Sequence, residues 1–386
     1  MKLFLDKSTW DKVNFGDVVK KVSNKIDPFE YDSDIVVEGG HINKRDFHIR
    51  KYENKNELGY LGPAFHMGFK KGQILYVSRN PHLMKVGYPD FDGICSNTTF
   101  ILESKNEEVL RNDLIPFLMH SDTFIEQSVG NVRGGVNPYV NWGDLACIEF
   151  LLPPIEQQAE LAELLWSIDD VNEKERVLSK NISQSIKTVS NNFFLSNNQK
   201  SVPLGNIGKW LSGGTPSRKQ ADYWNGDTPW ISPKDMKVEH LYSSQEMITD
   251  KAVASGAKLI PINTILFVVR GLILAHSFPV ALSKVACSFN QDMKAIMVSD
   301  EYDSEYVLCF LQHMKQTIVN LTTTTTHGTR RLATETISEL MMPLPDKEVR
   351  EYFTKNILTM KKSLSNCVLK IESTKSLQKS IINQVF

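Results

Sequence analysis

The sequence has almost no net charge and few cysteines. Its 44 basic and 45 acidic side chains leave a formal net charge of −1. A protein that grips nucleic acid alone usually carries a basic excess, because phosphate contacts supply much of the affinity. The five cysteines are odd in number and form no Cys-x-x-Cys pair. This usage argues against a disulfide framework and favours reduced thiols in the cytoplasm.

Long apolar runs are also missing. The most apolar stretch, residues 260–275, is interrupted by Pro261, Asn263 and Arg270, so no membrane span is expected. The apolar start at residues 1–5 is too short for a signal peptide, and we expect none. A chain of 386 residues with 41% hydrophobic and 23% charged content is typical of a globular protein with two or three domains.

Catalytic motifs are absent too. The sequence contains no Walker A loop, Gly-x-Gly-x-x-Gly, His-Glu-x-x-His or Gly-x-Ser-x-Gly motif, and no zinc-finger spacing. Asn137-Pro138-Tyr139 matches part of the Asn-Pro-Pro-Tyr motif of adenine methyltransferases. The second proline is missing and no glycine-rich loop precedes it, so a turn is the better interpretation. We predict no catalytic residues, no cofactor and no metal in this chain.

What the sequence does contain is an internal repeat with an offset of about 190 residues. Residues 73–79 resemble residues 264–270, and each segment ends in an arginine. The predicted elements that follow are strands at 99–102 and 293–298, helices at 114–127 and 306–319, and polar loops at 130–137 and 322–329. The shared order predicts an α+β fold made of two similar α/β domains with a pseudo-twofold internal repeat. Chance similarity between two unrelated domains is the alternative.

Each half then ends in a long stretch free of glycine and proline, residues 155–194 and 346–386. Pro154 suits the first helical turn, where its missing N–H costs nothing. Apolar side chains recur at gaps of three, four or seven, which predicts helices of about 40 residues, or roughly 60 Å. Neither helix can bury its stripe of apolar side chains alone, so we expect the two helices to pair as a coiled coil. Two ordinary core helices are the alternative. The predicted seam residues are Leu161, Leu165, Ile168, Leu178, Ile182, Ile186, Val189, Val349, Phe353, Ile357, Met360, Leu364, Ile371, Ile381 and Val385.

These boundaries divide the chain into four parts. The first domain covers residues 1–150, the first helical region residues 151–200, the second domain residues 201–343 and the second helical region residues 344–386. Two reading domains and two helices suit an extended partner, and duplex DNA is the natural candidate.

Binding chemistry lies on polar loops at matching places in both halves. Glycines allow close backbone approach, hydroxyls and amides bond phosphate, and arginine pairs with phosphate or guanine. A solvated turn is the alternative for each loop taken alone. The candidate DNA-binding residues are Arg79, Asn80, Arg133, Gly134, Gly135, Asn137, Thr215, Arg218, Lys219, Arg270, His327, Thr329, Arg330 and Arg331.

Three segments carry a family resemblance. Gly213-Gly214-Thr215-Pro216, together with residues 223–231, resembles the opening of a target recognition domain, and so do residues 10–18. Residues 151–158, with their Pro-Pro-x-Glu-Gln sequence, resemble the junction into a central helical region. Over essentially its whole length the chain resembles the specificity (S) subunit of type I restriction–modification systems.

The resemblance implies two target recognition domains that each read one half of a split, asymmetric DNA sequence. Two long helices would separate them, pack as an antiparallel coiled coil and dock methyltransferase (M) subunits. S-adenosylmethionine, ATP and Mg would then bind in partner M and restriction (R) subunits, which carry adenine-N6 methylation and ATP-dependent cleavage in phage defence.

Two departures from the family pattern stand out. Residues 343–347 lack the Glu-Gln of the first helix start, and the first domain lacks Gly-Gly-Thr-Pro. We therefore expect the two domains to read different half-sites. A free-standing bipartite DNA-binding regulator is the main alternative, and it would bind tightly without partners. A protein adaptor would bind no duplex even with the M subunit, and an enzyme with an unrecognised site is the third alternative.

Overall fold

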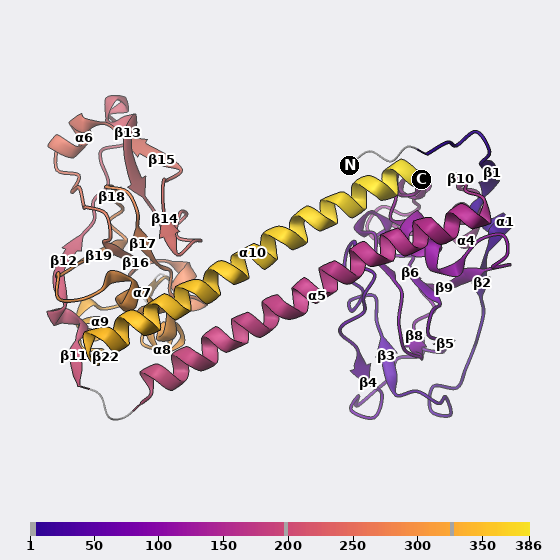
Figure 1. Ribbon diagram of the computed structural model, residues 1–386, viewed down its shortest axis with the longest axis horizontal. Coiled ribbons are helices and arrows are strands. Elements are labelled where there is room, and N and C mark those ends of the chain that lie inside the picture. The colour runs from indigo at the N-terminus through magenta and orange to yellow at the C-terminus, as the bar shows by residue number, and fades with distance from the viewer. Residues whose placement is uncertain (1–4, 197–199, 325–327) are drawn as a thin grey trace. The chain divides into compact units, whose positions relative to one another are not determined.

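The computed structural model describes residues 5–196, 200–324 and 328–386, which form two compact units. Unit 1 comprises Met1–Val177 with Cys367–Phe386, and unit 2 comprises Leu178–Asn366. Two long helices, α5 (Ile155–Phe194) and α10 (Lys347–Val385), contribute one part to each unit (Figure 1). Within the described residues, none of the helices is long and apolar enough to cross a membrane.

Unit 1 is built on two four-stranded sheets and one two-stranded sheet. An antiparallel sheet has the order β2-β9-β6-β7, a mixed sheet the order β4-β3-β8-β5, and β1 pairs with β10. All four residues of β6 are buried, as expected for a central strand. The strands are β1 (Asp11–Asn14), β2 (Val19–Val22), β3 (Ile35–Val37), β4 (Glu53–Asn54), β5 (Met67–Phe69), β6 (Ile74–Val77), β7 (Val86–Gly87), β8 (Gly93–Cys95), β9 (Thr99–Ser104) and β10 (Glu149–Leu152).

Short helices complete unit 1. The helix predicted at residues 114–127 is two helices, because Ser121 takes an extended conformation and its hydroxyl accepts a hydrogen bond from the Phe124 N–H at 3.1 Å. That side chain caps the second helix and ends the first. The helices are α1 (Phe15–Val18), α2 (Ile115–Met119), α3 (Asp122–Gly130), α4 (Trp142–Ala146) and the 3₁₀ turns η1 (Pro81–Leu83) and η2 (Asn112–Leu114).

Unit 2 repeats this plan. Its antiparallel strands β12-β19-β16-β17 match β2-β9-β6-β7, with β14 added in parallel to β17, and β11 pairs with β22 as β1 pairs with β10. The parallel contact of β13 with β18 corresponds to that of β3 with β8. The strands are β11 (Ser201–Pro203), β12 (Gly208–Ser212), β13 (Trp224–Ile231), β14 (His240–Leu241), β15 (Glu246–Ile248), β16 (Ile265–Val268), β17 (Val280–Ser283), β18 (Ser288–Phe289), β19 (Met293–Val298), β20 (Thr323–Thr324), β21 (Arg330–Arg331) and β22 (Met341–Pro343).

The helices of unit 2 follow the same order, and the helix predicted at 306–319 is again two. The fold class predicted from the repeat, two similar α/β domains with two long helices, is therefore confirmed. The helices are α6 (Asp250–Ala254), α7 (Ser304–His313), α8 (Lys315–Asn320), α9 (Thr334–Ser338) and the 3₁₀ turns η3 (Leu204–Asn206), η4 (Ala221–Tyr223) and η5 (Leu272–Ala275).

The long helices pair within each unit. In unit 1, Leu161 and Leu165 near the start of α5 share a buried core with Ile381 near the end of α10, and the Gln378 amide donates to the Leu165 carbonyl at 3.3 Å. In unit 2, Phe193 at the end of α5 stacks on Phe353 near the start of α10, with ring centroids 3.9 Å apart. The start of each helix thus lies beside the end of the other, which is the antiparallel arrangement.

The predicted helix bounds, 155–194 and 346–386, agree with α5 and α10 to within one residue. Most predicted seam residues are buried or half-buried. The prediction is wrong for Leu178, Val189 and Val349, which expose 47%, 38% and 45% of their surface. In α5 the inward face continues from Ile168 through Asn172 and Glu175 to half-buried Ser179. At 100° per residue this face leaves Leu178 on the outside.

The starts of the two helices are anchored differently. Gln158 is fully buried in unit 1 and makes three hydrogen bonds, accepting from the Arg111 N–H at 2.9 Å and donating to the Val109 and Pro153 carbonyls at 2.8 Å. In unit 2 Arg350 is buried at the corresponding place and donates to the Glu301 carbonyl at 3.3 Å. The start of α10 lacks the Glu-Gln sequence of α5 because a buried arginine, instead of a buried glutamine, fixes it to its domain.

Candidate functional site

In unit 1 the chain brings two predicted arginines to one tyrosine. Arg79 follows the end of β6 and forms an isolated bridge with Tyr139, whose ring centre lies 5.5 Å from the guanidinium. Arg133 pairs with the same tyrosine through two backbone hydrogen bonds of 2.9 Å. Asn80, in a left-handed conformation, donates its N–H to the Pro138 carbonyl at 2.7 Å. These contacts place Arg79, Asn80 and Arg133 on one exposed surface.

A projecting loop lies between Arg133 and Tyr139. Gly134 has a φ of 82°, and a Cβ there would come within 3.3 Å of the Asn137 carbonyl oxygen, so the turn favours glycine. Val136 exposes 95% of its surface, and Gly135 and Asn137 are exposed as well. An exposed loop with two glycines allows a partner to approach the backbone closely.

One side of the Arg133 guanidinium is already paired within the protein. Its Nη2 donates to Asp144 Oδ1 at 2.7 Å. The pKa of Asp144 is lowered by the hydrogen bond from the Asn141 N–H and by Arg133. Because one edge of the guanidinium is held by a carboxylate, its direction is fixed and its remaining N–H groups stay exposed.

Unit 2 builds an equivalent cluster at the end of β16. Arg270 forms an isolated bridge with Arg331, and the Gly271 N–H donates to the Arg330 carbonyl at 3.0 Å. The nearest carboxylate to Arg270 is Asp292, at 3.8 Å. Arg330 is half-buried and its Nη1 donates to the carbonyl and the hydroxyl of Thr322 at 3.3 Å, whereas Arg331 is exposed. In both units, therefore, the arginine that follows the central strand lies beside the polar loop near the end of the domain.

Surface ion pairs with Glu335 or Glu339 would give Arg330 and Arg331 a purely structural role, but no such pair occurs among the described residues. His327 lies outside the described residues. Thr329 is half-buried and lies next to Arg330 in the chain.

The Gly-Gly-Thr-Pro loop joins this cluster. The Gly214 N–H donates to the Phe289 carbonyl at 2.9 Å, and Thr215 Oγ1 accepts from the Asn290 amide at 3.4 Å. Asn290 in turn accepts from the Asp292 N–H at 2.7 Å, beside Arg270. A Cβ on Gly213 would lie 2.1 Å from the Asn290 carbonyl oxygen, so no other residue fits there.

Arg218 differs from the other predicted arginines. Its guanidinium lies 3.7 Å from the Trp224 ring centre and 5.2 Å from that of Trp230. It also forms a bidentate ion pair with Glu246, which raises the pKa of Arg218 and lowers that of Glu246. Its stacking and pairing fix the loop conformation, and Lys219 beside it is exposed.

Sequence reasoning missed several residues of these surfaces. Tyr139, Asn290 and Glu246 hold the predicted arginines or loops in place, yet nothing in their spacing distinguishes them. Tyr139 stood in a segment interpreted as a turn, and its position one residue after Pro138 was the one available signal. Among the described residues, no three His, Cys, Asp or Glu side chains gather as metal ligands do.

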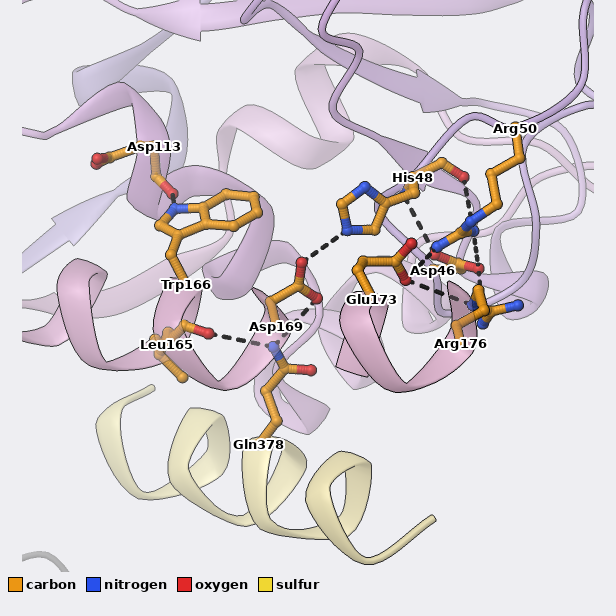
Figure 2. Close-up of polar contacts among 10 residues, drawn as sticks. All are labelled: Asp46, His48, Arg50, Asp113, Leu165, Trp166, Asp169, Glu173, Arg176 and Gln378. Atoms are coloured by element: carbon orange, nitrogen blue, oxygen red, sulfur yellow. Dashed lines mark hydrogen bonds and ion pairs between the residues drawn. The ribbon is translucent and has the colours of Figure 1, made fainter. Parts of the chain in front are cut away.

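A second polar network, also missed, joins unit 1 to the helix α5 (Figure 2). His48 Nε2 lies 2.6 Å from Asp169 Oδ2, and Arg50 bridges Asp46 at 2.6 Å and Glu173 at 2.5 Å. The hydrogen bond with Asp169 raises the pKa of His48. Burial would raise the pKa of Asp46, but Arg50 and Arg176 lower it overall.

These features define a class of protein: a duplicated α/β fold that carries the same arginine-and-loop surface twice and shares two long helices between its halves. A family model described as type I restriction modification DNA specificity domain matches residues 7–184 and again residues 197–379. The chain therefore belongs to that family, as its sequence resemblance predicted.

Individual proteins that resemble this chain are specificity subunits of type I restriction enzymes. The EcoR124I/EcoR124II specificity subunit of Escherichia coli is 39% identical over 37% of this chain and 36% of its own length. The chain thus spans about a third of the first relatives it matches. The HindI specificity subunit of Haemophilus influenzae is 20% identical over 94% of this chain and 95% of its own length.

Solved structures show the same fold. The S subunit of a type I restriction–modification system from M. genitalium matches with a TM-score of 0.65 at 14% identity, covering 100% of this chain and 99% of that one. A chain from a study of complex assembly in the type I R-M system matches with a TM-score of 0.59 at 17% identity, covering 97% of both.

Proposed function

We propose that this chain is the DNA sequence-recognition subunit of a type I restriction–modification complex and reads a bipartite, asymmetric site. The observation that carries this proposal is the duplicated surface: a strand-end arginine beside a polar loop, Arg79 with Arg133 in unit 1 and Arg270 with Arg331 in unit 2. Membership of the specificity-domain family supports the same function.

Each domain would read one half-site. Residues 1–150 would form the first target recognition domain and residues 201–343 the second, with the regions 151–200 and 344–386 as helical spacer. Backbone N–H groups and hydroxyls of the loops would contact phosphates, and arginines would contact phosphates or base edges. Different loops, with Gly-Gly-Thr-Pro in the second domain alone, would give the halves different base preferences.

Partner proteins would supply catalysis and part of the affinity. The net charge of −1 leaves little electrostatic attraction to DNA. The long helices also expose apolar side chains, including Leu178 at 47%, Tyr352 at 70% and Leu369 at 60%, which M subunits would cover. The chain itself would be non-catalytic. S-adenosylmethionine, ATP and Mg would act in M and R subunits, in the cytoplasm.

A domain exchange tests the modular part of this proposal. The chain is co-produced with its M subunit, and the methylated DNA motif is determined by sequencing. Replacing residues 201–343 by the second domain of a relative should change one half of the motif and leave the other half intact. A change in both halves would refute independent reading by the two units.

Arginine variants test the surfaces. Arg330→Ala with Arg331→Ala, and separately Arg79→Ala with Arg133→Ala, are assayed for duplex binding in the M-containing complex at several salt concentrations. Loss of a phosphate contact weakens binding to every sequence and lowers the salt slope by about 1, and loss of a base contact costs about 1–3 kcal/mol at one position. Arg111→Ala is the control, because Arg111 pairs with Asp113 outside these surfaces. Unchanged affinity and salt slope in either double variant would remove that surface from the DNA interface.

The alternative, a free-standing DNA-binding regulator, predicts a different result. It requires nanomolar, sequence-specific binding by the purified chain at physiological salt, without M subunit. Binding that becomes specific when M subunit is added excludes it.

A further inference from the structure

Unit 2 exposes two adjacent apolar side chains beside its arginine cluster. Leu272 and Ile273 expose 68% and 46% of their surface, and they lie on η5, which directly follows Arg270 and Gly271. Single exposed apolar side chains are common on protein surfaces. Two in succession, on the surface that carries the strand-end arginine, form a small apolar patch framed by polar groups, as sites of interaction do.

The turn that carries this pair is held in one conformation. Gly271 has a φ of 141° and a ψ of 163°, which only glycine adopts readily. Its N–H donates to the Arg330 carbonyl at 3.0 Å. On the other side of the pair, Leu274 is fully buried, and the Ile273 carbonyl accepts from the His276 N–H at 3.1 Å. The backbone under the pair is therefore fixed, so little conformational entropy is lost when a partner covers the two side chains.

The apolar pair also lies close to the cationic groups of the same surface. A Cβ on Gly271 would meet Ile273 Cγ2 at 3.8 Å, so the Ile273 side chain folds back over the residue that follows Arg270. Arg331, which forms a bridge with Arg270, is exposed. One surface thus offers guanidinium groups for phosphates or guanine and, beside them, an aliphatic patch.

The chemistry of DNA leaves few matches for an aliphatic patch. In the major groove, the C5-methyl group of thymine is the one apolar substituent of the bases. The other groups at the base edges are hydrogen-bond donors or acceptors, which lose their water without gaining a partner when leucine or isoleucine covers them. Phosphates are charged and are bound by donors instead. Two aliphatic side chains on a DNA-reading surface are therefore matched to thymine.

We propose that Leu272 and Ile273 determine base specificity in the half-site of unit 2 by packing against the C5-methyl group of a thymine. This inference rests on the proposed function, because it assigns the pair to the same DNA surface as Arg270. The pair favours thymine in two ways. It covers the methyl group, and it leaves the polar edge of any other base at that position without a hydrogen-bond partner.

The corresponding turn of unit 1 presents different chemistry. The turn η1 follows Arg79 and Asn80, as η5 follows Arg270 and its glycine. Pro81 of η1 is buried, and the exposed side chain is that of His82. An imidazole ring donates or accepts hydrogen bonds and so matches polar base edges. The two turns therefore favour different bases, which supports different preferences in the two half-sites.

Replacement of thymine by deoxyuridine tests the proposal, because it removes the methyl group and keeps every hydrogen-bonding group of the base pair. The complex of full chain and M subunit is titrated with duplexes that carry its motif, and each thymine of one half-site is replaced in turn. The exchange of residues 201–343 identifies the half-site that unit 2 reads. At one thymine the parent complex should bind the deoxyuridine duplex about fourfold more weakly, which is the effect of one buried methyl group.

Substitution of the pair should abolish this dependence on the methyl group. Leu272→Ser with Ile273→Ser should bind the thymine and deoxyuridine duplexes with equal affinity, and circular dichroism checks that the variant is folded. Ile262→Ser is the matched control. Ile262 exposes 58% of its surface in the same unit, but it precedes the start of β16, whereas Arg270 follows the end of that strand. This control should discriminate between the two duplexes as the parent does.

Four results would overturn the proposal. They are a unit 2 half-site without thymine on either strand, equal binding of both duplexes by the parent at every position, discrimination that persists in the double serine variant, and loss of M-subunit binding in that variant. The last result would assign the pair to a protein contact. All four leave the proposed function standing, provided that the parent complex binds its motif specifically. A parent complex that binds no DNA sequence specifically would refute the proposed function, and this inference with it.

Discussion

The two units hold their domains to the long helices with different chemistry. In unit 1, the loop at residues 46–50 meets residues 169–176 of α5 through charged hydrogen bonds (Figure 2). In unit 2, a single ion pair joins α10 to the corresponding loop, Lys361 with Glu239 at 2.7 Å, and Phe193 and Phe194 pack around Phe353 and Tyr306. The sheets are repeated, but unit 1 has more ion pairs at this junction than unit 2, so this fold accepts a different balance of ion pairs and apolar packing.

This difference has physical consequences. Charged contacts depend on pH and salt, because protonation and screening change their strength. Aromatic packing depends on buried area and ring geometry, and changes little with either. Unit 1, which has more of these ion pairs, should therefore be the unit whose attachment to the helix responds more strongly to solution conditions.

The largest effect should follow loss of the aromatic packing in unit 2. Phe353→Ala removes a side chain that is 4% exposed and contacts Phe193 and Phe194. The expected loss is about 3–5 kcal/mol in the free energy of unfolding, measured by urea denaturation. Phe353→Leu, which keeps most of the volume, should lose less than half of that. Equal losses in both variants would show that the stacking geometry decides the contact.

Breaking the polar network of unit 1 should cost less. Asp169→Ala leaves His48 and Gln378 without their shared acceptor. The expected loss is about 1–3 kcal/mol, and it should shrink in high salt, whereas the loss in Phe353→Ala should not. Asp170→Ala is the control, because Asp170 is exposed and pairs with Lys174 on the same helix. A loss that does not depend on salt would contradict the electrostatic account.

The Gly-Gly-Thr-Pro loop, present in unit 2 alone, offers a matched pair of substitutions. Gly213→Ala places a Cβ 2.1 Å from the Asn290 carbonyl oxygen, whereas a Cβ on Gly214 meets nothing within 4 Å. Gly213→Ala should destabilise unit 2 by about 1–3 kcal/mol and alter one half of the methylated motif. Gly214→Ala should be nearly neutral, and similar effects in both would refute the steric argument.

The smallest effect concerns pH. Asp169 raises the pKa of His48 above its unfolded value, so the contribution of protonated His48 is complete below about pH 6.5. It is lost as pH rises through the folded pKa. Burial lowers the pKa of His120 to about 3, which opposes this trend in acid. The difference in stability between the parent and His48→Gln isolates His48. That difference should fall as the pH rises above about 6.5, and a constant difference would contradict the assignment.

Much of the fold could be predicted from the sequence. The absence of glycine and proline over residues 155–194 and the regular apolar spacing predicted the start of α5 and, approximately, its end. The repeat predicted the shared strand order because both halves keep the same buried strands, such as residues 74–77 and 265–268. Helix breaks were harder to predict, because the break at Ser121 depends on one side chain that caps a backbone N–H.

The candidate site was predicted in part. Arg79 and Arg270 were identified because each ends a central strand, and the late loops because they are polar and rich in glycine or threonine. The contacts of Arg133 with Asp144 and of Arg218 with Glu246 were not predicted. Their partners lie 11 and 28 residues away, and no sequence period connects such pairs.

The sequence by itself determined the duplication, the two long helices and the family, because these depend on periodic patterns and on motifs that are local in the chain. The tertiary structure alone decided which polar side chains meet. It brought His48 to Asp169, 121 residues away, and it brought Gln378 to the same carboxylate from 209 residues away. Such contacts arise when distant segments pack on one helix face, and their free energy depends on distances and burial that no local pattern encodes.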